Sequence, residues 1–206
     1  HLLNHGGLLD RTYVGGVRSS IIWFIEIAIL CAVNCYAITS GYVSYGHKFK
    51  VSRTIKLWLQ ILFFSFGITL LFSLAGWNHK ESINIFQSLF PISNYVYWYA
   101  SAFFALTFFM PVLNLAAQQI DRKTAKIVFS GLLIFGIILP SFFAADPFRL
   151  LNGCSFAWLA IMWLVGALIK KFDLFSKVKI PIFFLLYIIS IVLSYVLRLL
   201  ILQFSQ

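Results

Sequence analysis

The chain has 206 residues, of which 61% are hydrophobic and only 11% are charged. A soluble domain carries about 45–50% apolar and about 25% charged residues, so this composition excludes a soluble globular protein and indicates an integral membrane protein. The formal net charge is +10, but the basic residues lie in short clusters between apolar runs. This pattern indicates membrane topology and argues against a nucleic-acid partner.

The predicted fold is all-α, a polytopic bundle of transmembrane helices. Residues 1–9 are expected to be the outer end of a truncated first helix. Six further apolar segments approach the ~20 residues that cross about 30 Å of hydrocarbon; they are 20–43, 54–76, 96–117, 125–144, 154–170 and 180–203. The segments are continuously apolar, which favours helices over a β-barrel. We expect residues 1–206 to form one partial transmembrane domain.

Clusters of Lys and Arg alternate between the two sides of these segments. Eleven basic residues follow the first, third and fifth segments, and four lie on the opposite side. Because cytoplasmic loops are enriched in Lys and Arg, we expect loops 44–53, 118–125 and 170–180 to be cytoplasmic. The sequence therefore predicts a multi-pass protein of the plasma membrane.

Glu26 is the acidic residue that lies well inside an expected span. At 100° per residue, Glu26, Asn34 and Gly41 fall within about 80° of one another on a helix. Intramembrane carboxylates are costly and are typical of functional sites, so Glu26 and Asn34 are candidates for a proton relay or for orienting a catalytic His. The alternative is a structural hydrogen bond to a neighbouring helix.

His1 and His5 lie four residues apart, a spacing that could hold a metal on one helix face. No carboxylate or Cys lies near them, and Cys31, Cys35 and Cys154 form no metal-binding or disulfide pattern, so we expect no metal. A His at membrane depth suits a general base, because its unperturbed pKa of about 6.5 allows proton transfer near neutral pH. The alternative is a terminal residue that happens to be His.

Two pairs of side chains could contact a ligand. Arg53 and Lys56 follow a predicted cytoplasmic loop and could receive an anionic cofactor, since Arg suits phosphate; the alternative is ordinary snorkelling at the membrane edge. Trp98 and Tyr99 could form an aromatic wall for a sugar or an acyl chain, or could belong to an interfacial aromatic belt.

Four blocks of sequence, in this order, carry a family resemblance: His1 with Gly6-Gly7, Cys31 to Tyr42, Arg53 to Gln60, and Trp98-Tyr99 with Pro111 to Asn114. With them the chain resembles the acyltransferase 3 family of bacterial integral-membrane O-acyltransferases. The second block, which ends in Ile-Thr-Ser-Gly-Tyr, is close to that family's aromatic-x-Ile-Ser-Gly-Tyr pattern. The resemblance spans nearly the whole chain.

The resemblance implies an acyl-CoA-dependent enzyme that moves an acyl group, expected to be acetyl, to a hydroxyl of a cell-surface polysaccharide or a lipid-linked sugar. His1 matches the family's catalytic histidine and would act as the general base. Arg53 with Lys56 would lie near the CoA phosphates, and Ser40 and Tyr42 could donate hydrogen bonds within the site.

The family has an arginine about ten residues before this histidine and about ten spans in all. The chain is therefore expected to be a fragment that lacks the start of the first helix and the C-terminal helices.

Two other functions stay open. Spans that contain Pro111 and Pro140, together with the buried Glu26, would also suit a transporter or flippase, although the sequence contains no convincing internal repeat. The chain could also be the membrane module of a larger protein with a separate catalytic domain.

Overall fold

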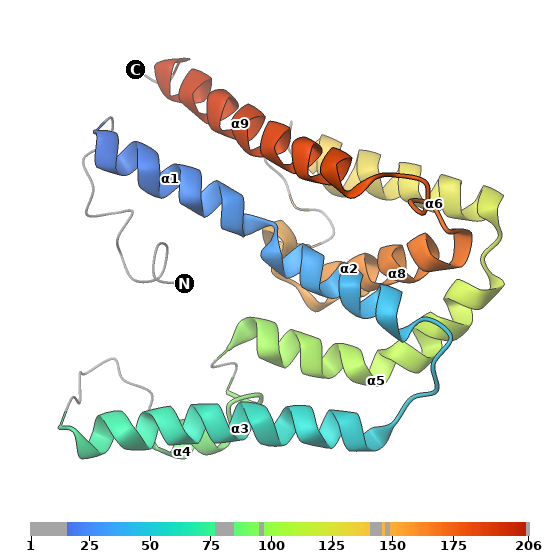
Figure 1. Ribbon diagram of the computed structural model, residues 1–206. Coiled ribbons are helices and arrows are strands. Elements are labelled where there is room, and N and C mark those ends of the chain that lie inside the picture. Colours follow the sequence, from blue (N-terminus) through green and yellow to red (C-terminus); the bar gives the residue numbers. More distant parts are fainter. Residues whose placement is uncertain (1–15, 77–84, 95–96, 141–145, 147–148, 205–206) are drawn as a thin grey trace. The chain divides into compact units, whose positions relative to one another are not determined.

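Every element that the structure describes is a helix. The computed structural model describes residues 16–76, 85–94, 97–140, 146 and 149–204, and no strand occurs in these ranges, which confirms the all-α prediction (Figure 1). The elements in chain order are α1 (Val17–Leu30), α2 (Ala32–Ser44), α3 (Val51–Leu74), α4 (Ile85–Leu89), α5 (Trp98–Gln119), α6 (Arg122–Leu133), the π-helix η1 (Ile134–Ile138), the 3-10 helix η2 (Leu151–Gly153), α8 (Phe156–Phe172) and α9 (Ile180–Phe204).

Four described helices are long and apolar enough to cross a membrane; they are Arg18–Ser44, Val51–Leu74, Trp98–Gln119 and Ile180–Ile201. The first comprises α1 and α2 with a turn at Cys31. The expected spans 125–144 and 154–170 are not confirmed. The helix that begins as α6 continues through η1 to residue 140, but residues 141–144 of the expected span lie outside the described residues. α8 has 17 residues, fewer than the ~20 that a full crossing needs. Residues 1–9, the expected truncated helix, lie outside the described residues.

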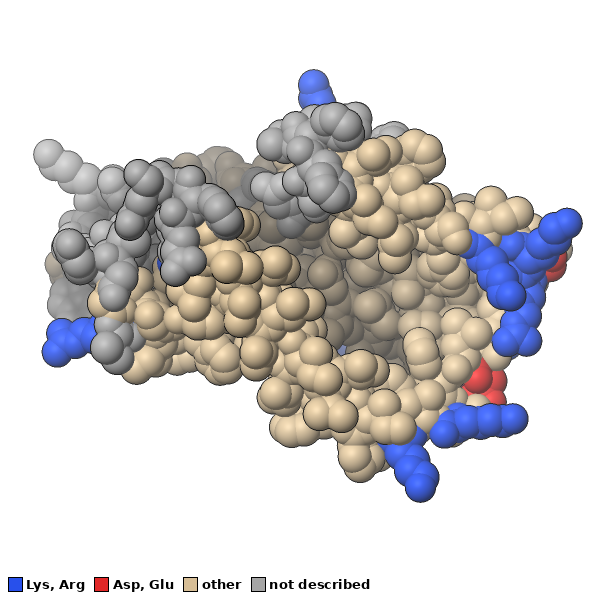
Figure 2. Space-filling model, turned by 90° about the horizontal axis from the view of Figure 1, so that it is seen from above, with Lys and Arg blue, Asp and Glu red and all other residues tan. Residues whose placement is uncertain are grey.

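The chain divides into two compact units, whose boundary falls inside α2. Unit 1 consists of the residues up to Cys35 together with those from Leu174 onward, and unit 2 consists of Tyr36–Asp173. On the face that Figure 2 shows, Lys and Arg side chains gather in a few groups and most of the described surface is uncharged. Many large apolar side chains of α3 and α9 are exposed, as expected of helices that face lipid.

In unit 1, α1 and α9 lie side by side in antiparallel orientation (Figure 1). Three contacts establish the register. The Arg198 guanidinium lies 4.1 Å from the centre of the Trp23 ring, the rings of Phe24 and Tyr195 lie 5.9 Å apart, and the Tyr187 hydroxyl donates a hydrogen bond of 2.6 Å to the Ala28 carbonyl.

In unit 2, α2 and α8 touch backbone to backbone, and two glycines make this possible. A Cβ atom on Gly41 would lie 1.8 Å from the Trp163 carbonyl oxygen, and one on Gly166 would lie 1.9 Å from the Ile38 carbonyl oxygen. Because the hydrophobic effect does not drive association within lipid, small residues that permit close van der Waals packing are the main determinant of such a contact.

The C-terminal end of α8 is fixed to the C-terminal end of α5 by Lys171. Its Nζ atom donates hydrogen bonds to the carbonyl oxygens of Ala117, Gln118 and Ile120, at 3.0, 2.8 and 2.5 Å. The last carbonyls of a helix have no partner within the helix, and a cation there also interacts favourably with the helix dipole. Lys171 therefore provides donors for the last carbonyl groups of α5. It also brings the basic loops 118–125 and 170–180 to one end of unit 2.

The chain turns directly from α5 into α6 at Asp121, which caps α6. Its carboxylate accepts hydrogen bonds of 3.2 Å from the backbone N–H groups of Lys123 and Thr124. Hydrogen bonds from Thr124, and then from the Lys123 N–H, lower the pKa of Asp121 below its ordinary value. The short connection keeps the basic first turn of α6 at the same end of unit 2.

Candidate functional site

Unit 2 contains a cavity of about 260 Å³ at the end where α2 finishes and α3 begins. We call it the basic cavity. Its walls come from the last turns of α2, the following loop, the first turns of α3, one face of α5 and one residue of α8. The lining residues are Ser40, Ser44, His47, Lys48, Phe49, Lys50, Arg53, Thr54, Leu57, Phe103, Thr107, Met110, Pro111, Asn114 and Trp163.

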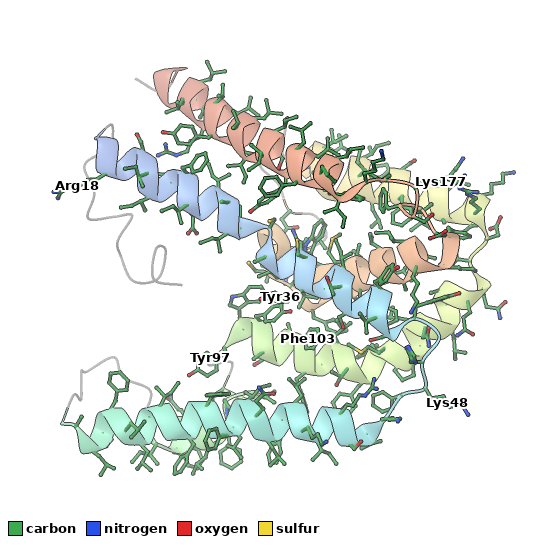
Figure 3. The ribbon with its side chains drawn as sticks, in the orientation of Figure 1. Arg18, Tyr36, Lys48, Tyr97, Phe103 and Lys177 are labelled. Atoms are coloured by element: carbon green, nitrogen blue, oxygen red, sulfur yellow. The ribbon has the colours of Figure 1, made fainter. Side chains whose placement is uncertain are left out.

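The rim of the basic cavity is strongly positive. Lys48, Lys50 and Arg53 line it and are exposed, and no acidic residue belongs to the lining. In the part of the chain that the structure describes, none of these three cations forms an ion pair. Figure 3 shows Lys48 on the loop between α2 and α3, and Phe103 on α5. Three cations without a carboxylate favour an anionic ligand group, with Arg especially suited to phosphate.

Asn114 fixes the loop between α2 and α3, which carries Lys48 and Lys50. Its Oδ1 atom accepts a hydrogen bond of 3.1 Å from the Gly46 N–H, and its Nδ2 atom donates one of 3.2 Å to the His47 carbonyl. Gly46 has a φ of +78°, a left-handed conformation that glycine adopts without strain. The side chain thus fixes the turn from which Lys48 and Lys50 project.

The inner wall of the basic cavity is mostly apolar and contains an unpaired donor. Trp163 is fully buried, and its indole Nε1 has no hydrogen-bond partner among the described residues. Thr107 is buried as well, and its hydroxyl donates to the Phe104 carbonyl at 2.7 Å. A buried N–H group without a partner costs about 1–3 kcal/mol, so Trp163 occupies this position at a cost in stability.

Trp98 and Tyr99 continue the wall along α5 without lining the cavity themselves. The Trp98 ring meets the Tyr99 ring edge-on at 5.7 Å, and Tyr99 stacks at 5.8 Å on Phe103, which does line the cavity. The predicted aromatic pair is therefore the start of a row of rings that reaches the cavity.

Of the other residues predicted from the sequence, the structure brings Ser40 and Arg53 together at the basic cavity. Lys56 is exposed on α3 and does not line it. Tyr42 is 46% exposed, and its ring lies 5.6 Å from the Lys170 ammonium, so it also lies away from the cavity.

The remaining predicted residues belong to unit 1. His1 lies outside the described residues. Glu26 is half-buried on α1 and forms no ion pair with any described residue. Asn34 lines a separate groove between α9 on one side and the end of α1 and the start of α2 on the other.

Apart from Ser40 and Arg53, none of the residues that line the basic cavity was predicted as a site residue; those missed include Lys48, Lys50, Asn114, His47, Thr107 and Trp163. His47, Lys48 and Lys50 lie in the predicted cytoplasmic loop 44–53, which was a usable signal. The contribution of Trp163 depends on the packing of α8 against α2 and could not be read from sequence spacing. No group of three or more His, Cys, Asp or Glu side chains gathers within the described ranges.

No family model, curated protein or solved structure matches this chain. The geometry of the basic cavity and the motif resemblance are therefore the features of this chain that bear on its function.

Proposed function

We propose that the chain is part of a membrane-embedded O-acyltransferase resembling the acyltransferase 3 family, which moves an acetyl group from acyl-CoA to a hydroxyl of a cell-surface polysaccharide or a lipid-linked sugar. The observation that carries the proposal is the basic cavity. Its three cations suit the phosphates of CoA, and its mostly apolar inner wall suits the pantetheine arm.

The motif blocks and the cavity support one another. The second, third and fourth blocks each contribute to its lining, with Ser40, Arg53 and Asn114 respectively. Blocks that are far apart in the sequence would converge in this way if they served one site. Lys171 and Asn114 also bring the basic loops to one end of unit 2, which supports a cytoplasmic location for loops 44–53, 118–125 and 170–180.

In the proposed reaction, the acceptor hydroxyl attacks the thioester carbonyl carbon, an ester C–O bond forms and the C–S bond breaks. His1 takes the hydroxyl proton, which then passes to the CoA thiolate. A general base of this kind contributes about 10²–10⁴-fold to the rate. The complete six-span topology, with the plasma membrane as its location, belongs to the same proposal.

The decisive experiment measures release of the CoA thiol by the full-length protein in liposomes, with acetyl-CoA and cell-surface glycan. His1→Ala is expected to lower the rate by about 10²–10⁴-fold. His5→Ala is the matched control, because it removes the same side chain four residues away, and it is expected to retain the rate. Retained activity in His1→Ala would refute the catalytic assignment. No thiol release by the folded wild type with several acceptors would favour the transporter or flippase alternative.

A further inference from the structure

Unit 1 contains a second polar feature, a groove of about 410 Å³ between α9 on one side and the end of α1 and the start of α2 on the other. We call it the polar groove. Both of its walls belong to helices that are long and apolar enough to cross a membrane. Polar side chains at such positions are costly in lipid and typically mark a binding site or a pathway.

The polar residues of α9 that line the groove form a single stripe. They are Tyr187, Ser190, Ser194 and Arg198, at intervals of three or four residues that place them on one helix face. Most other residues of α9 are apolar. The stripe therefore faces α1, whereas the lipid-facing surface of α9 is apolar.

In the part of the chain that the structure describes, the side chains of Tyr187 and Ser190 form hydrogen bonds within the protein, whereas those of Ser194 and Arg198 do not. The Tyr187 hydroxyl donates to the Ala28 carbonyl at 2.6 Å, and the Ser190 hydroxyl donates to the Tyr187 carbonyl at 2.7 Å. Among the described residues, Ser194 and Arg198 form no hydrogen bond and no ion pair. Two adjacent positions on one face thus offer the donors of a guanidinium and a hydroxyl without a protein acceptor.

The position of Arg198 differs from that of a snorkelling side chain. Its guanidinium lies 4.1 Å from the centre of the Trp23 ring, so it is held against α1. Arg198 lies three residues before Ile201, the end of the candidate span, or about 4.5 Å along the axis. Arg198 is therefore close to one end of the candidate span.

We propose that the polar groove binds the phosphodiester of one anionic phospholipid of the surrounding membrane, of which phosphatidylglycerol is the representative. The guanidinium forms a bidentate contact with the phosphate, and the Ser194 hydroxyl adds a third donor. No acidic residue lines the groove, so nothing there pairs with the amine of a zwitterionic lipid. A single guanidinium matches one phosphodiester charge, and the acyl chains lie on the apolar surfaces of the two helices.

The test uses the purified full chain in mild detergent and measures, by native mass spectrometry and by thermal shift, the binding of phosphatidylglycerol against phosphatidylcholine. We expect preferential binding of phosphatidylglycerol, reduced about tenfold in Arg198→Gln, as for the loss of a charge-assisted bidentate contact. Lys177→Gln is the matched control, because it removes the same charge outside the groove and is expected to leave binding unchanged. Soluble glycerol 3-phosphate is expected to bind weakly, since it lacks the acyl chains.

A second variant keeps the proposal testable even if Arg198→Gln does not fold. Ser194→Leu leaves the charge in place but fills the groove, and it is expected to lower phosphatidylglycerol binding while the protein remains folded. Binding that is equal for the two lipids, or unchanged in both groove variants, would overturn the proposal. An equal loss in Lys177→Gln would also overturn it, because the attraction would then come from overall charge. The readout is binding, so its outcome is independent of acyltransferase activity.

Discussion

Gly41→Ala is expected to lower the free energy of unfolding by about 3 kcal/mol or more, the upper range for overpacking of a filled interface. The added Cβ atom would lie 1.8 Å from the Trp163 carbonyl oxygen, which is part of the α8 backbone. A helix backbone cannot give way as the end of a flexible side chain can, so α2 and α8 must separate. Denaturant or thermal unfolding in mild detergent measures the effect.

Two other glycines make this prediction specific. Gly166→Ala should be equally destabilising, because its Cβ would lie 1.9 Å from the Ile38 carbonyl oxygen. Gly67→Ala is the control, since nothing lies within 4 Å of its added Cβ. In the interior of α3 this substitution is expected to stabilise the protein by about 0.5–1 kcal/mol. If Gly41→Ala proved as stable as Gly67→Ala, the close contact between α2 and α8 would be wrong.

Arg53→Gln is expected to weaken acetyl-CoA binding by about 10–100-fold. The substitution removes a guanidinium from the rim of the basic cavity, and hydrogen bonds to charged groups contribute about 1.5–3 kcal/mol. The rim is exposed, so the contribution should shrink as salt is raised. Equilibrium binding to the purified protein at two ionic strengths measures both effects.

Lys56→Gln is the matched control for Arg53→Gln. Lys56 lies three residues further along α3 and carries the same charge, but it does not line the basic cavity. We expect its loss to change binding less than threefold, about the effect of a more distant, screened charge. Equal losses in the two variants would mean that the general positive potential attracts the ligand and that Arg53 makes no local contact.

The helices themselves could be predicted well, because long apolar runs in lipid must satisfy their backbone internally. The points at which the helices are interrupted or change type could not be predicted. The first predicted span is interrupted by a turn at Cys31, although its hydropathy runs on without a break. The predicted span 125–144 changes from α-helix to π-helix at Ile134, a change that nothing in its composition indicates.

The candidate site could be predicted only where one helix face decides it. Ser40 and Ser44 lie four residues apart and share the face of α2 that lines the basic cavity, whereas Tyr42, about 200° from Ser40, must point elsewhere. The resemblance named Ser40 and Tyr42 alike and could not separate these faces. Asn114 and Gly46 lie 68 residues apart, so their contact depends on tertiary packing that local patterns do not encode.

Pro111 lies inside α5 and lines the basic cavity together with Thr107. Proline has no N–H group, so the Thr107 carbonyl oxygen lacks the donor that a helix normally supplies four residues later. An unsatisfied carbonyl in hydrocarbon costs several kcal/mol, and in transmembrane helices water commonly restores the missing hydrogen bond. The consequence is that α5 presents, beside the basic cavity, a backbone acceptor without its helical donor, and water or a donor group of a ligand can satisfy it.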